Sequence, residues 1–241
     1  MKASTVEIVF VIDASTSMKP FFEGLANNLD SFLKPLQGFN FKIRLGLLTL
    51  KVARSSDGGS VIYATTLAEN DYRTIYQDAK NLFTESPDEF LRSLRDVDLN
   101  GEESNLIALD MALDFPFGAL SSTRRVVAIF SDEKIEDGAI DASHIQNIPK
   151  LIKKLADRRI RLFGAMPTSE ALEVLGSADG SQIQVVESGN GLSKLDFEKL
   201  LGQIAKSISV TSLQGDESEY ERALFGQDQW GIGEGSFEGL A

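Results

Sequence analysis

A continuous apolar run near the N-terminus constrains the fold more than any other feature of the chain. The seven residues VEIVFVI, 6–12, are β-branched or aromatic except for Glu7. Such a run is typical of a strand that is buried on both faces of a parallel sheet. The run stops on Asp13, and Ser15 and Ser17 follow at alternate positions. One carboxylate and two hydroxyls therefore gather at the point where a buried strand ends.

Strand-length apolar runs alternate with segments of helical period along most of the chain. The segment 17–38 places apolar side chains at three- and four-residue steps, which predicts an amphipathic helix ending near Gly38. Further strand-like runs lie at 41–50, 61–67, 124–133, 160–166 and 181–188, and further helices are predicted at 86–97, 105–115, 148–159, 169–178 and 194–208. The alternation predicts an α/β fold with a doubly wound, mostly parallel central sheet, one antiparallel edge strand, and helices on both faces.

Charge and rare residue types exclude several classes of function. The 241 residues carry a net charge of −12, and such an acidic surface repels nucleic acid and anionic membranes. The absence of cysteine removes disulfides and thiolate metal sites, and the single histidine, His144, excludes a His-rich site. No apolar run approaches the ~20 residues of a membrane span. The N-terminus lacks the pattern of a signal peptide, so we expect a cytoplasmic protein.

The C-terminal end of the chain differs in composition from the rest. We predict one domain over 1–213 and an acidic tail rich in Gly and aromatic residues over 214–241. From Asp216 onward the tail has seven acidic residues and one basic residue, about half of the net charge. Two interpretations stay open: a disordered tail, or a segment that docks on another protein or a second copy through Tyr220, Phe225 and Trp230. The basic stretch 153–161 is interpreted as the solvated end of a helix, or as a dock for this tail.

The run 124–133 resembles the first strand in how it ends, because it stops on a second acid, Asp132. In an open parallel sheet, ligands bind outside the carboxyl ends of the strands. If the two strands are neighbours, Asp13 and Asp132 meet at one rim together with Ser15 and Ser17. Two carboxylates and several hydroxyls form an all-oxygen shell, which suits Mg²⁺ first, with Mn²⁺ or Ca²⁺ as substitutes. The alternative is that both aspartates only cap loops and helix N-termini, without a metal.

The motif D-x-S-x-S, read here as Asp13-Ala14-Ser15-Thr16-Ser17, resembles the metal-ion-dependent adhesion site of the von Willebrand factor type A (vWA) family. The segment VVAIFSDE resembles the strand of that family that carries the second aspartate, here Asp132. The order of predicted elements agrees with the family from about residue 5 to residue 212. The resemblance implies a Rossmann-like fold and a protein–protein interaction module whose metal-binding rim is the recognition face. Bacterial intracellular members often work beside AAA+ ATPases or in stress and conflict systems.

One position departs from the family pattern. The family supplies a threonine ligand from a loop before the helix that precedes the second aspartate. Aligning GEESNLIALDMAL with that pattern without gaps places Glu103 at the threonine position, and Ser104 follows one residue later. We predict Glu103 as the fifth metal ligand, with Ser104 as the alternative if the loop is shifted. A third carboxylate would fill the coordination position of a partner's acidic group and make the site a self-satisfied variant.

The resemblance therefore favours a non-enzymatic module that binds another protein through a divalent cation at the rim of the sheet. One alternative is a structural protein that self-assembles through its acidic tail. A second alternative is a metal-dependent hydrolase built on paired carboxylates, although no nucleophile, phosphate-binding glycine loop or D-x-D motif accompanies Asp13. His144 is interpreted as a surface residue near the start of a helix.

Overall fold

The chain folds around a mixed β-sheet. The computed structural model describes residues 5–37, 41–54, 60–67, 82–99, 104–137, 143–189, 192 and 194–214. Within these residues, six strands pair in the order β3-β2-β1-β4-β5-β6. Their bounds are Thr5–Ile12 for β1, Lys42–Arg54 for β2, Ser60–Thr66 for β3, Thr123–Phe130 for β4, Ile160–Pro167 for β5 and Ser181–Val186 for β6.

The sheet has the predicted doubly wound topology. All neighbouring strands are parallel except β3, which is antiparallel to β2 at one edge. From the central strand β1 the chain first builds outward to β2 and β3, and then returns to the other side of β1 to build β4, β5 and β6. The strand order therefore reverses between β1 and β4, which is where ligands bind in open α/β sheets.

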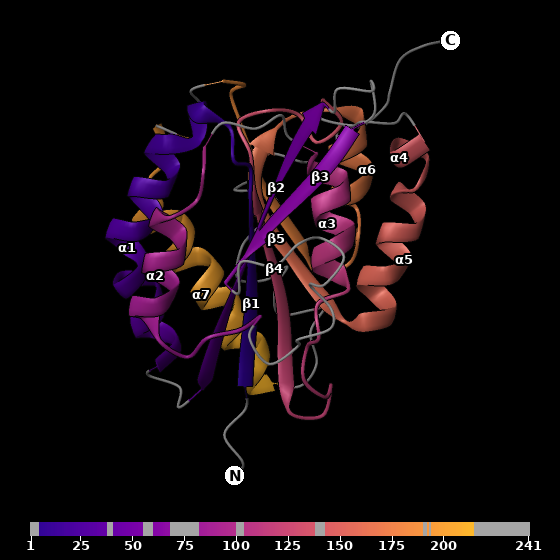
Figure 1. Cartoon of the computed structure of the whole chain (residues 1–241). Coiled ribbons are helices and arrows are strands. Elements are labelled where there is room, and N and C mark those ends of the chain that lie inside the picture. The colour runs from indigo at the N-terminus through magenta and orange to yellow at the C-terminus, as the bar shows by residue number, and fades with distance from the viewer. Residues whose placement is uncertain are drawn as a thin grey trace.

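Helices cover both faces of the sheet (Figure 1). Helices α1, α2 and α7 lie on one face, and α3, α4, α5 and α6 lie on the other. A single 3₁₀ turn, η1, spans Thr16–Met18 and leads from the end of β1 into α1. The helices are bounded at Lys19–Gln37 for α1, Pro87–Arg95 for α2, Asn105–Leu113 for α3, Ser143–Gln146 for α4, Ile148–Arg158 for α5, Glu170–Gly176 for α6 and Phe197–Gln214 for α7.

Strand β1 lies between two hydrophobic cores, one on each face of the sheet. Its even-numbered residues, such as Ile8 and Phe10, pack beneath α1 and α7, whereas Val9 and Val11 pack beneath α3 and α5. All four side chains are at most 1% exposed. This double burial explains why the sequence of β1 is a continuous apolar run and does not alternate with polar residues.

Most element boundaries agree with the sequence prediction, with a few differences. Strand β2 continues to Arg54 and helix α7 continues to Gln214, so the predicted domain boundary at 213 falls in the last turn of α7. The short helix α4, which contains the half-buried His144, was not predicted as a separate element. The tail from 215 onward lies outside the described residues. None of the described helices is both long and apolar enough to cross a membrane.

Candidate metal centre

Strands β1 and β4 end side by side, as the sequence predicted. Ile12 is paired with Phe130 in the parallel register, and the backbone N–H of Asp13 donates to the carbonyl of Phe130 at 3.0 Å. Because both strands end at this point, Asp13 and Asp132 lie at the same rim of the sheet. The switch point of the sheet therefore carries two carboxylates.

The carboxylate of Asp13 is held on both of its oxygens. Oδ1 accepts a hydrogen bond from the backbone N–H of Ser15 at 2.7 Å, and Oδ2 accepts one from the Ser131 hydroxyl at 2.7 Å. The side chain is only 4% exposed. Burial raises the pKa of Asp13, while the hydrogen bonds from Ser131 and Ser15 lower it in part. Asp13 thus caps the turn after β1, as the metal-free alternative expects.

A short chain of hydroxyls joins Asp13's loop to the second aspartate. Ser17 Oγ donates to Asp132 Oδ1 at 3.0 Å, and Ser15 Oγ lies 3.0 Å from Ser17 Oγ. The 3₁₀ turn η1 begins directly after Ser15, and its tight winding brings the two serines to the same side of the loop. The four predicted ligands Asp13, Ser15, Ser17 and Asp132 therefore form one hydrogen-bonded cluster.

Asp132 differs from Asp13 because one of its oxygens has no partner. The side chain is 1% exposed, and Oδ2 is buried without a hydrogen-bond partner among the described residues. Burial raises the pKa of Asp132, the hydrogen bond from Ser17 lowers it, and the nearby charge of Asp13 raises it further. The charge nearest to Asp132 is therefore negative. An unpaired buried carboxylate costs free energy unless a cation compensates its charge.

Helix α3 begins at the same rim. Asn105, its first residue, donates from Nδ2 to Ser131 Oγ at 3.1 Å. Ser104 precedes it as the N-cap residue, but its side chain makes no cap hydrogen bond. The Ser104 hydroxyl is buried and has no partner among the described residues. Glu103, the residue that we predicted as the fifth ligand, lies outside the described residues.

Sequence reasoning missed two residues of this cluster, Ser131 and Asn105. Ser131 is fully buried and is bonded to Asp13, Asn105 and the backbone N–H of Glu133. A weak signal was present, since Ser131 directly precedes Asp132 at the end of β4. Asn105 gave no such signal, because its contact with Ser131 spans 26 residues and depends on where α3 lies.

The donor set at the rim is chemically uniform. Among the described residues, no three His, Cys, Asp or Glu side chains come together as a metal site, so hydroxyls have to complete any cation shell here. The side chains that converge are two carboxylates and the hydroxyls of Ser15 and Ser17. The hydroxyl of Ser104 lies at the N-terminus of α3, next to Asn105. Oxygen ligands of this kind suit hard cations such as Mg²⁺ and Ca²⁺ and are poor ligands for softer metals.

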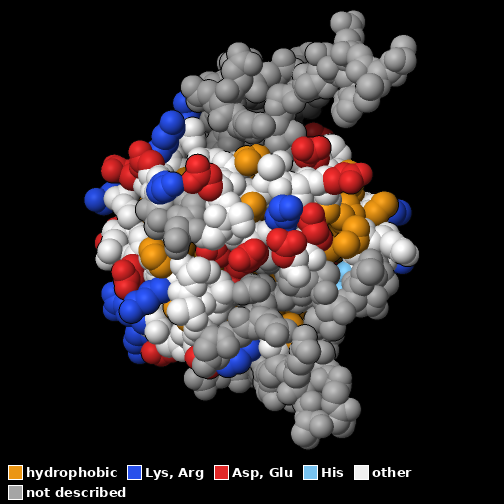
Figure 2. All heavy atoms as spheres, turned by 90° about the horizontal axis from the view of Figure 1, so that it is seen from above, with side chains coloured by type: hydrophobic (Ala, Val, Ile, Leu, Met, Phe, Trp, Pro, Cys, Tyr) orange, Lys and Arg blue, Asp and Glu red, His pale blue; other side chains and the backbone are white. Residues whose placement is uncertain are grey.

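The surface around the cluster is also acidic. Figure 2 views this end of the molecule, and Asp and Glu side chains gather over its centre. The loop after Asp132 contributes Glu133, Glu136 and Asp137, with Lys134 between them. Burial raises the pKa of Glu133, and the charges of Asp132, Asp137 and Asp13 raise it further. The negative potential at this rim attracts cations to the cluster.

Other predicted binding regions lie elsewhere. Tyr220, Phe225 and Trp230 of the tail lie outside the described residues. The basic stretch at the end of α5 is largely neutralised by acids of the same domain: Lys153 pairs with Asp157, Lys154 with Asp110 and Asp114, and Arg158 with Asp114. This pairing favours the solvated helix end over a dock for the acidic tail.

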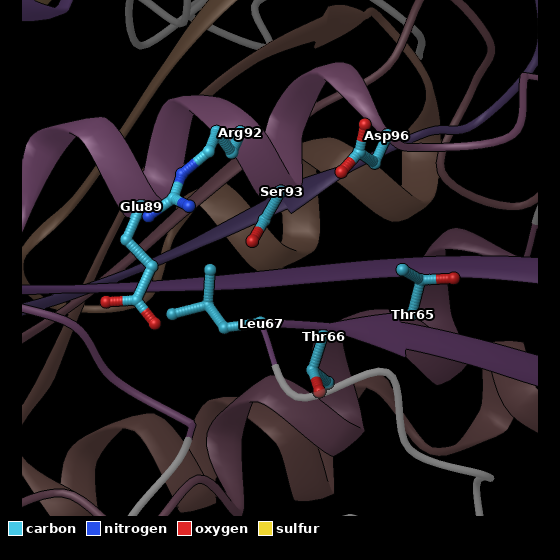
Figure 3. Close-up of a pocket in the computed structure, with 7 residues that line it drawn as sticks. All are labelled: Thr65, Thr66, Leu67, Glu89, Arg92, Ser93 and Asp96. Carbon is cyan, nitrogen blue, oxygen red and sulfur yellow. The ribbon is translucent and has the colours of Figure 1, made fainter.

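A second hollow lies between the end of β3 and helix α2 (Figure 3). Its volume is about 420 Å³, and its walls are formed by Thr65, Thr66, Leu67, Glu89, Arg92, Ser93 and Asp96. The charged side chains there are exposed and of opposite sign, and Glu89 already accepts a hydrogen bond from Thr84. This hollow therefore lacks the buried, unpaired groups that distinguish the rim of the sheet.

Comparisons with known proteins give a fold but no close relative. No protein-family model matches the sequence, and no curated protein matches it. Among solved structures, the crystal structure of the SpRpn10 VWA domain matches with a TM-score of 0.51 over 83% of this chain and 95% of that chain. The chain has the fold of a VWA domain. The sequence identity is 14%, so the likeness concerns the fold alone.

The VWA fold agrees with the resemblance that the D-x-S-x-S motif predicted. In all, 195 chains of known structure match this chain. A shared fold does not by itself imply a function. The bacterial type of the protein and the variant form of its metal site remain predictions. Function therefore has to be argued from the residues at the rim.

Proposed function

We propose that this protein is an interaction module that binds a divalent cation at the carboxyl ends of β1 and β4 and uses this rim to recognise another protein. The cation ligands are Asp13, Ser15, Ser17 and Asp132, with Ser104 completing the set. Mg²⁺ is the expected ion, because the ligands are few, small and all oxygen, and Mn²⁺ or Ca²⁺ can replace it. When bound, the cation supplies positive charge to a rim at which carboxylates and hydroxyls converge.

The observation that supports this proposal is the pair of buried, unpartnered oxygens at the rim. The metal-free alternative explains Asp13, whose oxygens are both used by hydrogen bonds within the fold. It does not explain why Asp132 Oδ2 and the Ser104 hydroxyl are buried without partners in the part of the chain that the structure describes. Buried polar groups in native proteins are nearly always satisfied by a protein group, a water or an ion, so each exception calls for an explanation. A cation bound by both oxygens would satisfy them.

For the fifth ligand we favour Ser104, the alternative, over Glu103. Ser104 is only 2% exposed. Its hydroxyl makes no cap hydrogen bond with α3, so it is available as a ligand. The hydrogen bond from the adjacent Asn105 to Ser131 fixes this end of α3 beside Asp13. With Ser104 as ligand, the site has two carboxylates that match the charge of the ion. A partner's acidic group then has a coordination position left to fill.

The choice between the two residues can be tested directly. We expect Ser104→Ala to weaken Mg²⁺ binding by at least about tenfold, because contact of a hydroxyl with a charged group contributes about 1.5–3 kcal/mol. If Glu103 does not coordinate the ion, Glu103→Gln is expected to change the Kd by less than about threefold, because a charge that acts through water is largely screened. Isothermal titration calorimetry on both variants measures the two effects. The opposite order of effects would make Glu103 the ligand.

The interaction role calls for a separate experiment. The full chain is immobilised and exposed to a lysate of its source organism in Mg²⁺ or in EDTA. We expect a partner to be retained in Mg²⁺ and released in EDTA, and Asp132→Asn to fail to retain it even in Mg²⁺. A variant with Tyr220, Phe225 and Trp230 all replaced by Ala is expected to behave like the unchanged chain. Retention by Asp132→Asn, or loss only in the tail variant, would favour recognition or self-assembly through the tail.

A further inference from the structure

We infer that Ser131 and Asn105 are positioning residues of the cation site, which orient Asp13 and fix the beginning of α3 against the rim. This inference rests on the proposed cation site and adds two residues that do not themselves contact the ion. Both side chains are buried, Ser131 at 0% and Asn105 at 3% exposure, so neither is available to a partner protein. Their role has to be exerted on the residues around them.

The hydrogen bonds that Ser131 accepts leave one direction in which its hydroxyl can donate. A hydroxyl has one hydrogen to donate and two lone pairs to accept with. Asn105 Nδ2 donates to Ser131 Oγ at 3.1 Å, and the backbone N–H of Glu133 donates to it at 3.0 Å. Both lone pairs are thereby used, and the one hydrogen is directed to Asp13 Oδ2 at 2.7 Å. Asn105 therefore helps to determine that Ser131 donates to Asp13.

The consequence for Asp13 is a fixed carboxylate. Oδ2 is held by Ser131 and Oδ1 by the backbone N–H of Ser15, so the carboxylate plane cannot rotate without breaking one of two short hydrogen bonds. Each oxygen accepts one bond and retains a lone pair for a further interaction. A ligand set that is fixed before the ion arrives loses less conformational freedom on binding, which strengthens the binding. Ser131 thus prepares Asp13 for the cation.

Asn105 has a second effect because it belongs to α3. It is the first residue of the helix and follows Ser104 directly. Its hydrogen bond to Ser131 is a side-chain link between the beginning of α3 and the end of β4. Loss of this link would let the N-terminus of α3 move away from the rim and carry the Ser104 hydroxyl with it. A single pair, Asn105 and Ser131, therefore supports ligands that come from two separate segments.

A double-mutant cycle tests whether the two residues act as one unit. Ser131→Ala and Asn105→Ala are each expected to weaken Mg²⁺ binding by about 10–100-fold, the range for residues that support metal ligands. Because Asn105 acts through Ser131, the double variant is expected to bind no more weakly than Ser131→Ala. Ser131→Thr keeps the hydroxyl and is expected to restore binding. Calorimetry with Mg²⁺ and electron paramagnetic resonance of free Mn²⁺ give two independent measures of the Kd.

Two controls separate positioning from a general loss of structure. Thr16→Ala removes a hydroxyl that lies between the two ligand serines but bonds to the carbonyl of Leu99, and it is expected to leave the Kd within about twofold. Thermal unfolding in EDTA reports whether each variant still folds. If Ser131→Thr does not fold, the cycle of the three alanine variants still decides.

The outcomes distinguish this inference from the proposed function. If the unchanged chain binds neither Mg²⁺ nor Mn²⁺, the cation site is wrong and the positioning role is overturned with it. If the unchanged chain binds and both alanine variants bind equally well, only the positioning role is overturned. Losses that multiply in the double variant would show two independent effects and would likewise overturn the relay from Asn105 through Ser131.

Discussion

Mg²⁺ at a hundredfold excess over its Kd is expected to raise the free energy of unfolding by about 2.7 kcal/mol, and Asp132→Asn is expected to abolish this rise. The gain follows because the ion binds the folded chain, in which residues from β1 and β4 converge, and not the unfolded chain. Asp132 is the sharpest position for the test, since its Oδ2 is buried and has no partner among the described residues. Urea denaturation in Mg²⁺ and in EDTA measures the effect for both proteins.

In EDTA, where no ion is bound, Asp132→Asn is expected to increase the stability of the fold. Burial is the largest cause that raises the pKa of Asp132 above its ordinary value of 3.8. A carboxyl whose pKa is raised by folding contributes stability fully below pH 3.8, and that contribution is lost as the pH rises through the raised value. The neutral amide of Asp132→Asn avoids this loss. At neutral pH the variant without metal is therefore expected to be more stable than the unchanged protein by ~1–2 kcal/mol, and the difference should vanish below pH 3.8.

Asp137→Asn is the matched control for these measurements. It removes one negative charge from the same loop, but the side chain is exposed and does not take part in the cluster. Its response to Mg²⁺ is expected to follow that of the unchanged protein. A chain that gains no stability from Mg²⁺, or that gains as much with Asn at position 132 as with Asp, would contradict a cation at this rim.

The fold could be predicted because the sequence of each strand reports its surroundings. The β1 run is apolar at every position but the buried Glu7, because burial on both faces of the sheet favours apolar side chains. Period and length then separated strands from helices over most of the chain. The short helix α4 escaped prediction, since four residues are too few to show a helical period. Helix α3, predicted within 105–115, is buried at seven of its nine positions.

The candidate site was predictable only where its residues lie next to a strand end. Asp13 and Asp132 could be placed together from the topology of an α/β sheet, and Ser15 and Ser17 from their spacing. The sequence favoured Glu103 with Ser104 as the alternative, because an ungapped comparison cannot determine which of two adjacent loop residues enters the site. Asn105 was missed altogether, since a hydrogen bond between a helix and a distant strand depends on packing that no local pattern encodes.

The same limit hid a row of charges at the opposite end of β1. Glu7 pairs in register with Arg44 of β2 on one side and with Arg125 of β4 on the other. Its carboxylate is 1% exposed, forms an ion pair with Arg44, and accepts from the backbone N–H of Gly118 at 2.7 Å. Burial and the charge of Arg158 lower the pKa of Arg125, while the charge of Glu7 raises it. The row of Glu7, Arg44 and Arg125 depends on the register of three strands. The sequence by itself shows only one acid in an apolar run.

Glu7→Ala is expected to lower the free energy of unfolding by about 3–5 kcal/mol, because it leaves the Arg44 guanidinium and the Gly118 N–H without their partner in a largely buried site. The exposed pair of Lys42 and Glu85 provides the control, since both side chains are more than half exposed and Glu85→Ala is expected to cost less than about 1 kcal/mol. Urea denaturation measures both. Replacing Glu7 by Leu and Arg44 by Met together is expected to recover part of the loss, because it removes the unpaired charge of Arg44, whereas the Gly118 N–H stays without its acceptor. Equal costs for Glu7→Ala and Glu85→Ala would show that the buried row does not stabilise the sheet.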